Sequence, residues 1–387
     1  MMALILLFWS LFGILALAPA CFIFLYMIRS SRKPWPTKVD SNYQPYVSVL
    51  VPTYNESNTI LLKLANLARV TYPRELMEVV VVDSNSSDST VNTVKQFSEK
   101  EPQLNLRVLV EEERKGKSHA LNWALDNCKG DVIVVSDADC FWPSDVLEKS
   151  IPFLADPSVG AIGGPKVLLN ADTTWVTKME TSYMKSANTL RFGESKAGST
   201  LFGEGGFGAF KREAFDRFDP YCTGSDDCGT IINVIAKDFR SMLVPEAKFF
   251  SAFPESYRGK MAVKLRRTNQ LVRVFGKYLN LLFRRKLNRN NLVIIPNILL
   301  YMISPFAFLL LIPLSIILFW TYPLSLIILV LLLSSRVRFY FFQICESNIL
   351  LFASICSILT GRRFSIWSQP DDRTLFTQEI LRQFNLI

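Results

Sequence analysis

The chain has a single histidine, and none of its seven cysteines forms a Cys-x-x-Cys pair. A zinc site is therefore not expected, because structural zinc sites are built from clustered thiolates and imidazoles. No Gly-x-Gly-x-x-Gly stretch follows the first predicted strand, which argues against a dinucleotide cofactor of the Rossmann type. Internal repeats and low-complexity linkers are also lacking.

Basic residues are missing before the first apolar run and follow directly after it. Residues 3–28 carry no charge and are long enough to cross about 30 Å of hydrocarbon, and Arg29, Arg32 and Lys33 come next. A cleavable signal peptide has the opposite order, so we expect a retained anchor over 1–30. Because positive charge stays in the cytoplasm, the middle of the chain should be cytosolic and its cysteines free thiols.

Apolar residues dominate again from 291 to 361, after a linker at 31–44 and a central domain. Breaks at proline and arginine suggest blocks near 294–319, 322–335 and 339–360. A cytosolic tail at 362–387 requires an odd number of crossings, so one block is expected to be interfacial or half-length. We therefore expect a multi-pass protein of the cell membrane with lipids as partners.

The charge of the chain is unevenly distributed. Its formal net charge is +9, and much of the excess lies in residues 261–290, where basic side chains alternate with Leu, Val and Phe. This pattern is typical of an amphipathic helix held by anionic headgroups. Nucleic-acid binding is the competing use of a basic patch. It is not expected here, because apolar blocks follow at once.

Residues 45–260 read as a soluble domain in which strands and helices alternate. Such alternation indicates an α/β fold with a doubly wound sheet. The expected strands are 47–51, 78–82, 104–110 and 131–136, and the expected helices are 59–70, 89–101 and 118–127.

Two carboxylates, Asp137 and Asp139, directly follow the apolar strand 131–136. In α/β sheets, ligands bind at the carboxyl ends of the strands, and hard oxygen ligands suit Mg²⁺ or Mn²⁺. An Asp-x-Asp pair is often only a solvated turn. Polar residues also follow the first two strands, where Asp83 and Asp88 are helix caps or ligands of a nucleotide.

A series of motifs then occurs in a fixed order along the chain. They are 47–56, 82–88, 114–122, Asp137-Ala138-Asp139, the glycine-rich stretch 203–213, 245–247 and 254–255. Together they resemble the membrane-bound family 2 glycosyltransferases of polysaccharide biosynthesis, which are relatives of hyaluronan, chitin and cellulose synthases. The resemblance implies a GT-A-like doubly wound mixed sheet with transmembrane helices at both ends. It also implies inverting transfer from a nucleotide-sugar, with a UDP-sugar expected.

The resemblance assigns roles to particular residues. Asp227 falls at the position of the catalytic base, and Asp139 with Asp137 at the Mn²⁺ or Mg²⁺ site. Residues at substrate-binding positions are Pro52, Tyr54, Glu56, Asp83, Asp88, Lys117, Asp137, Gly205, Gly206, Asp226, Gln270 and Arg273.

Two motifs depart from the family pattern. The usual Thr-Glu-Asp is Ser225-Asp226-Asp227, and the usual Gln-x-x-Arg-Trp ends in Val274 after Gln270 and Arg273. In the family that Trp lies at the acceptor end, so its loss favours few additions over a long polymer.

Several alternatives remain open. The acceptor is a growing glycan, a polyprenyl phosphate or another lipid. A catalytically silent membrane sugar-nucleotide sensor or scaffold is the rival from another class, and a transporter is not expected. The segment 366–374 resembles a part that covers the nucleotide site in some relatives, although Trp367 could equally be an interfacial anchor.

Overall fold

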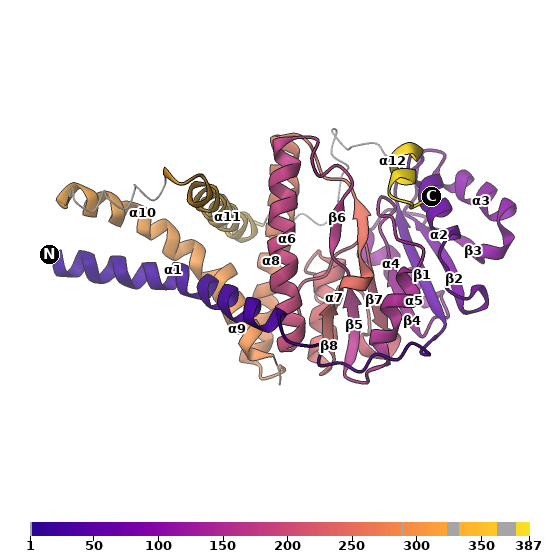
Figure 1. Cartoon of the computed structure of the whole chain (residues 1–387), viewed down its shortest axis with the longest axis horizontal. Helices are drawn as coiled ribbons and strands as arrows, with labels where there is room; N and C mark the ends of the chain where they lie inside the picture. Colours follow the sequence, from indigo (N-terminus) through magenta and orange to yellow (C-terminus); the bar gives the residue numbers. More distant parts are fainter. Residues whose placement is uncertain (1, 288–289, 323–332, 362–376) are drawn as a thin grey trace.

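The computed structural model of the 387-residue chain describes residues 2–287, 290–322, 333–361 and 377–387. Figure 1 shows an α/β domain at one end and a group of apolar helices at the other. Two long helices, α6 (Trp175–Ala197) and α8 (Tyr257–Phe283), stand between them.

The domain is built on a seven-stranded mixed sheet with the order β3-β2-β1-β4-β7-β5-β8. The first four strands are mutually parallel where they pair, and β7 is antiparallel to both of its neighbours. This arrangement confirms the predicted doubly wound mixed sheet. The strands are β1 Val47–Thr53, β2 Met77–Asp83, β3 Leu106–Val110, β4 Val132–Val135, β5 Val159–Gly163, β7 Gly208–Lys211 and β8 Arg240–Leu243.

Continuous apolar runs form the central strands because both faces of the sheet are covered. In β2, Val79 and Val81 belong to one hydrophobic cluster, whereas Val80 and Val82 belong to the other. Successive side chains point to opposite faces, so a strand between two cores has no polar position. The predicted strands up to residue 136 match the structure to within two residues.

Helices and turns connect the strands and cover the sheet. The predicted helices 59–70, 89–101 and 118–127 are confirmed to within two residues. The helices of the domain are α2 Ile60–Ala68, α3 Thr90–Lys100, α4 Lys117–Asp126, α5 Val146–Ser150 and α7 Asp226–Ala236. Short 3-10 turns are η1 Arg74–Leu76, η2 Pro102–Leu104, η3 Ile151–Ala155, η4 Arg212–Ala214 and η5 Pro245–Ala247. A second, parallel two-stranded sheet consists of β6 Lys166–Leu168 and β9 Phe249–Ser251.

Among the described residues, three helices are long and apolar enough to cross a membrane: Ala3–Ser31, Asn291–Thr321 and Tyr340–Leu359. They coincide with the predicted blocks 3–28, 294–319 and 339–360, whereas most of the predicted block 322–335 lies outside the described residues. The elements that form them are α1 Met2–Ser31, α9 Asn291–Ile298, the π-helix η6 Leu299–Ile303, α10 Ser304–Thr321 and α11 Ser335–Leu359.

Helix α6 joins the apolar helices to the domain. At Gly193, an added Cβ would lie 2.0 Å from the carbonyl oxygen of Met27, so α1 and α6 are in backbone contact. Glu194 accepts hydrogen bonds from Thr200 Oγ1 at 2.8 Å and from Asn297 Nδ2 of α9 at 3.2 Å. Burial raises the pKa of Glu194 to about 7, although these hydrogen bonds oppose the shift.

The carboxyl-terminal residues return to the domain. Helix α12 (Gln378–Gln383) places Leu381 in a cluster with Phe141 and Phe250, and Asn66 Nδ2 donates to the carbonyl of Leu386 at 2.7 Å. The segment 366–374, which resembles a cover for the nucleotide site, lies outside the described residues.

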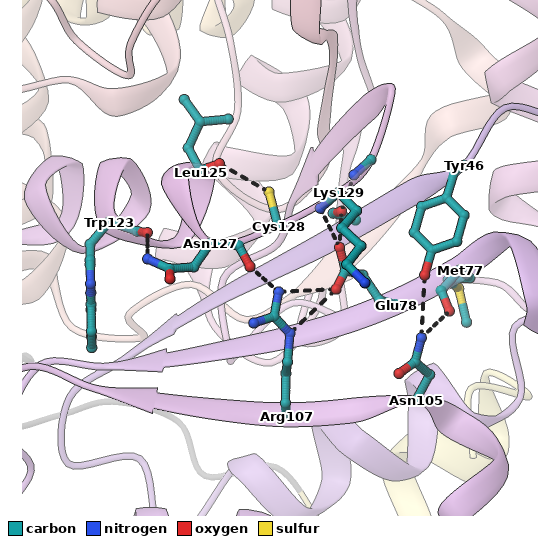
Figure 2. Close-up of polar contacts among 12 residues, drawn as sticks. Tyr46, Met77, Glu78, Asn105, Arg107, Trp123, Leu125, Asn127, Cys128 and Lys129 are labelled. Atoms are coloured by element: carbon teal, nitrogen blue, oxygen red, sulfur yellow. Dashed lines mark hydrogen bonds and ion pairs between the residues drawn. The ribbon is translucent and has the colours of Figure 1, made fainter.

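The amino ends of β1, β2 and β3 carry one buried carboxylate, Glu78 (Figure 2). It accepts hydrogen bonds from Ser48 Oγ at 2.5 Å and from the Lys129 amide at 2.7 Å. Arg107 pairs with it at 3.1 Å and also donates to the carbonyl of Asn127. Burial alone would raise the pKa of Glu78, but these donors outweigh it and lower the pKa.

Candidate functional site

A cavity of about 270 Å³ lies at the carboxyl ends of β1 and β4. Ligands of α/β sheets bind at this type of position, beside the switch in strand order. Its walls are the loop after β1, the glycine-rich loop before β7, the end of β9 and helix α8. The predicted site residues that line it are Pro52, Tyr54, Glu56, Lys117, Asp137, Asp139, Gly205, Gly206, Asp226 and Gln270.

Lys117 is the central cation of the cavity. Its Nζ lies 2.6 Å from Asp137 Oδ1 and 2.8 Å from Asp226 Oδ2, so one side chain joins two motifs 89 residues apart in sequence. Lys117 is the first residue of α4, after Gly116, whose φ of 101° suits glycine. Burial lowers the pKa of Lys117, but the two carboxylates outweigh burial and raise it.

The carboxylates around Lys117 hold their charge less easily than free ones. Burial raises the pKa of Asp137 to about 6, and Asp139 adds to the shift although Lys117 opposes it. Burial also raises the pKa of Asp226. Clustered acids with raised pKa values are typical of sites that receive a cation or a proton.

Asp137, Asp139 and Cys140 could together approach a metal, since their ligand atoms lie within 4.8 Å of one another. Burial raises the pKa of the Cys140 thiol well above its usual value, and hard cations such as Mg²⁺ prefer oxygen to sulfur ligands. The donor set is therefore two carboxylates, which fits Mg²⁺ or Mn²⁺ better than zinc.

The loops after β1 and β3 form the opposite wall. The guanidinium of Arg114 lies 3.6 Å from the centre of the Tyr54 ring, and both side chains line the cavity. The Glu56 amide donates a hydrogen bond to Thr90 Oγ1 at 2.9 Å, which holds the loop after β1 against α3. A planar cation stacked on an aromatic ring can face a base or a phosphate.

Three predicted substrate residues lie outside the lining: Asp83, Asp88 and Arg273. Asp83 is fully buried and accepts hydrogen bonds from Thr53 Oγ1 at 3.0 Å and from the Ser86 amide at 2.8 Å. Asp88 accepts from the amides of Ser57 and Thr90, each at 3.0 Å. In this structure both carboxylates brace the loops that form the wall.

Gly205 and Gly206 have neighbours so close that neither position has room for a Cβ atom. A Cβ at Gly205 would lie 2.5 Å from Asp137 Oδ2, and one at Gly206 would lie 2.1 Å from the Phe249 ring. The glycine-rich loop also accepts a hydrogen bond from the metal motif: the Asp137 amide donates to the Gly205 carbonyl at 3.0 Å. The glycines thus allow this loop to press against the metal motif.

Asp227 lies beside the cavity rather than in its lining. It borders a second, small cavity under the glycine-rich loop, together with Gly203 and Asp226. Its carboxylate accepts hydrogen bonds from Ser225 Oγ and from the Cys228 amide at 2.6 Å. Burial would raise the pKa of Asp227, but these donors outweigh it and lower the pKa.

Helix α8 contains two predicted residues, Gln270 and Arg273, and two residues of the lining that were not predicted, Arg266 and Arg267. Gln270 Nε2 donates to the Gly224 carbonyl at 2.5 Å and Arg273 Nη2 to the Cys222 carbonyl, so both hold the loop before Asp226. Arg273 is not in the lining. Arg266 and Arg267 line the cavity instead. A spacing of seven residues puts Arg266 and Arg273 on the same helix face, a signal that the sequence does contain.

Lys166 at the start of β6 and Glu204 in the glycine-rich loop also line the cavity and were not predicted. Glu204 pairs with Arg191 of α6 at 2.5 Å. No sequence motif marks Lys166, because its place depends on the pairing of β6 with the distant strand β9.

Comparison with known proteins agrees with this geometry. A sequence profile of Glycosyl transferase family 2 matches residues 48–218. The solved structure of the mannosyltransferase PcManGT from Pyrobaculum calidifontis, in complex with GDP-Man and Mn²⁺, is similar with a TM-score of 0.75 and 31% identity. The similarity covers 92% of this chain and 100% of that one. This chain belongs to glycosyltransferase family 2. Its sheet is accordingly a GT-A fold.

Curated members of the family are similar over shorter stretches. An N-acetylglucosaminyltransferase of Rhizobium meliloti is 29% identical over 241 residues, which are 59% of this chain and 56% of that protein. The glycosyltransferase AglE of Haloferax volcanii is 34% identical over 120 residues, 31% of this chain and 39% of that protein. The chain thus matches about half the length of these relatives or less.

Proposed function

We propose that the family 2 chain transfers a hexose from a nucleotide-sugar to a glycan or lipid-linked acceptor at the membrane, with inversion. The observation that carries this proposal is the cavity in which Lys117 joins Asp137 of the metal motif to Asp226 of the acidic motif. Donor and acceptor chemistry would thereby meet in one place. The basic residues after α1 favour a cytosolic catalytic domain.

On the donor side, Asp139 and Asp137 would hold Mn²⁺ or Mg²⁺, which supplies positive charge for the departing diphosphate. Tyr54 and Arg114 would contact the nucleotide. Arg266 on α8 would hold phosphate oxygens through its planar guanidinium. It would do so in place of Arg273, which the motif put at a substrate-binding position but which lies outside the lining. The complex of the related mannosyltransferase with GDP-Man and Mn²⁺ supports a nucleotide-sugar donor and a divalent metal.

On the acceptor side, Asp227 would take the proton of the attacking hydroxyl. The hydroxyl oxygen then bonds to the anomeric carbon while the bond to the diphosphate breaks on the opposite face, which inverts the carbon. The lowered pKa of Asp227 keeps it ionised and able to accept a proton. Its neighbour Asp226 is already paired with Lys117 and would position that cation.

The test is a panel of UDP- and GDP-sugars supplied to the full chain in detergent with Mn²⁺ or Mg²⁺. We expect metal-dependent release of one nucleoside diphosphate, and NMR of the product should show the anomeric configuration inverted relative to the donor. Chromatographic sizing of the product would separate single from repeated addition. A panel without release would favour the silent sensor if UDP or GDP still binds, and the scaffold if neither binds.

A further inference from the structure

Helix α2 carries a completely buried lysine, Lys63, beside the metal motif Asp137-Ala138-Asp139. Its Nζ donates hydrogen bonds of 2.6 Å to Ser136 Oγ and of 2.6 Å to the Cys140 carbonyl. The Nζ also lies 4.3 Å from the centre of the Trp142 ring, in a cation–π contact. These three partners are neutral groups, and the reaction described above gives Lys63 no role.

A buried ammonium whose partners are neutral destabilises a fold relative to an apolar side chain of similar size. Burial lowers the pKa of Lys63 to about 7, although the charges of Cys140, Asp137 and Asp139 oppose this shift. An apolar residue such as methionine would fill the same space without this penalty. What only the lysine supplies is a set of hydrogen-bond donors beside the metal motif.

The two hydrogen bonds of Lys63 fix both ends of the turn that carries the metal carboxylates. Ser136 directly precedes Asp137, and Cys140 directly follows Asp139. Within the turn, the Cys140 amide donates to the Asp137 carbonyl at 3.1 Å. Because one ammonium joins the two ends, the backbone between them cannot spread without breaking a hydrogen bond to Lys63. The directions of the two carboxylates follow from this backbone.

The partners of Lys63 also hold the glycine-rich loop. Ser136 Oγ donates to the Gly206 carbonyl at 3.2 Å, and Trp142 Nε1 donates to the same carbonyl at 2.7 Å. The Gly206 carbonyl thus accepts hydrogen bonds from two side chains that Lys63 contacts. Helix α2 thereby holds the metal motif and the glycine-rich loop, which both line the cavity, in one arrangement.

We infer that Lys63 is a positioning residue for the divalent metal, which directs Asp137 and Asp139 toward one ion by holding both ends of their turn. This inference rests on the proposed function, in which Mn²⁺ or Mg²⁺ binds these carboxylates. Lys63 acts through the turn, because it lies outside the lining of the cavity. Residues behind metal ligands typically contribute about 10- to 100-fold to metal affinity.

The test titrates Mn²⁺ into the full chain in detergent and follows it by EPR, which measures free Mn²⁺ and the symmetry of the bound ion. Lys63→Met keeps the length of the side chain but removes its charge and its donors. Loss of the charge alone should strengthen the binding of a cation. We expect Lys63→Met instead to weaken Mn²⁺ binding roughly 10-fold and to change the spectrum of the bound ion, because the carboxylates are no longer held.

Lys63→Gln separates the hydrogen bonds from the charge, since a neutral amide can donate to both acceptors. It should bind Mn²⁺ at least as tightly as the wild type. Lys95→Met is the matched control, because Lys95 is an exposed lysine of the neighbouring helix α3, and its Mn²⁺ affinity should stay as in the wild type. Thermal melting without metal shows separately whether each variant is folded.

Unchanged Mn²⁺ affinity in Lys63→Met overturns the inference. Tighter binding in Lys63→Met and Lys63→Gln alike also overturns it, because Lys63 would then act only as a charge. Should Lys63→Met not fold, Ser136→Ala decides instead: it removes one acceptor and should weaken Mn²⁺ binding, and unchanged affinity in this variant overturns the inference. Failure of the proposed function would appear differently, as no transfer from any nucleotide-sugar while Mn²⁺ binding still depends on Lys63.

Discussion

At the amino ends of the strands Glu78 is surrounded by donors from Ser48, Lys129 and Arg107, whereas at the carboxyl ends Asp137 and Asp226 share Lys117. The pKa of Glu78 is lowered and the pKa values of Asp137 and Asp226 are raised, although burial acts in the same direction on all three. The pKa values shift in opposite directions because Glu78 has several hydrogen-bond donors, whereas Asp137 and Asp226 share the single cation Lys117. One end of the sheet uses a carboxylate for stability, and the other leaves carboxylates under-compensated for a ligand.

The largest expected effect is a loss of transfer rate on substitution in the acidic motif Ser225-Asp226-Asp227. Asp227→Asn should lower transfer about 10²–10⁴-fold, because the amide cannot accept the acceptor proton. Affinity for the nucleoside diphosphate should stay as in the wild type, measured by calorimetry beside the turnover rate. Asp126→Asn, which changes an exposed aspartate of α4, is the matched control. Wild-type turnover in Asp227→Asn, with loss in Asp226→Asn, would move the base to Asp226.

A substitution in the metal motif should change the affinity for the nucleoside diphosphate. Asp139→Asn should weaken Mn²⁺-dependent nucleoside diphosphate binding by at least about 10-fold, since even residues behind metal ligands contribute that much. Chelation with EDTA should reduce wild-type binding to a similar level. Thermal stability should not fall, because a charge is removed from an acidic cluster. A variant with unchanged affinity but a lower melting temperature would make Asp139 a structural residue like Glu78.

At the amino ends of the strands, a substitution should lower stability and leave the affinity for the nucleoside diphosphate unchanged. Glu78→Gln should lower the free energy of unfolding by roughly 3 kcal/mol, because charged hydrogen bonds to buried donors are lost. Nucleoside diphosphate affinity of the folded protein should not change. Thermal melting and calorimetry on the same sample measure both quantities. Loss of affinity at unchanged stability would contradict the division between the two ends.

What the sequence could not predict is which of two equivalent residues faces the cavity. Apolar runs gave β1, β2 and β4 to within two residues, since a doubly covered strand leaves no polar position. Asp226 and Asp227 are consecutive in α7, so the rotation of that helix decides between them. Arg266 and Arg273 share one face of α8, and the choice depends on where the helix starts. Ser256 sets that start by accepting a hydrogen bond from the Gly259 amide at 3.0 Å.

The smallest expected effect concerns the buried acid at the join with the membrane helices. The pKa of Glu194 is raised from 4.5 to about 7, so the folded state holds a proton that the unfolded state releases. Stability should therefore fall as pH rises from about 4.5 to 7 and level off above that. Glu194→Gln should remove this fall and melt a few degrees higher than the wild type at pH 8. Equal slopes in both proteins between pH 5 and pH 7 would exclude Glu194 as the source.

The backbone contact between Gly193 and Met27 has a consequence for the reach of the enzyme. Because no side chain separates α1 from α6, the α/β domain cannot tilt away from α1 without breaking this contact. If α1 spans a bilayer, as we propose, the distance between that bilayer and the cavity is set by the protein and not by the substrate. An acceptor whose reactive hydroxyl lies at that distance from its lipid would be used efficiently. Longer or shorter acceptors of the same chemistry would be excluded by length alone.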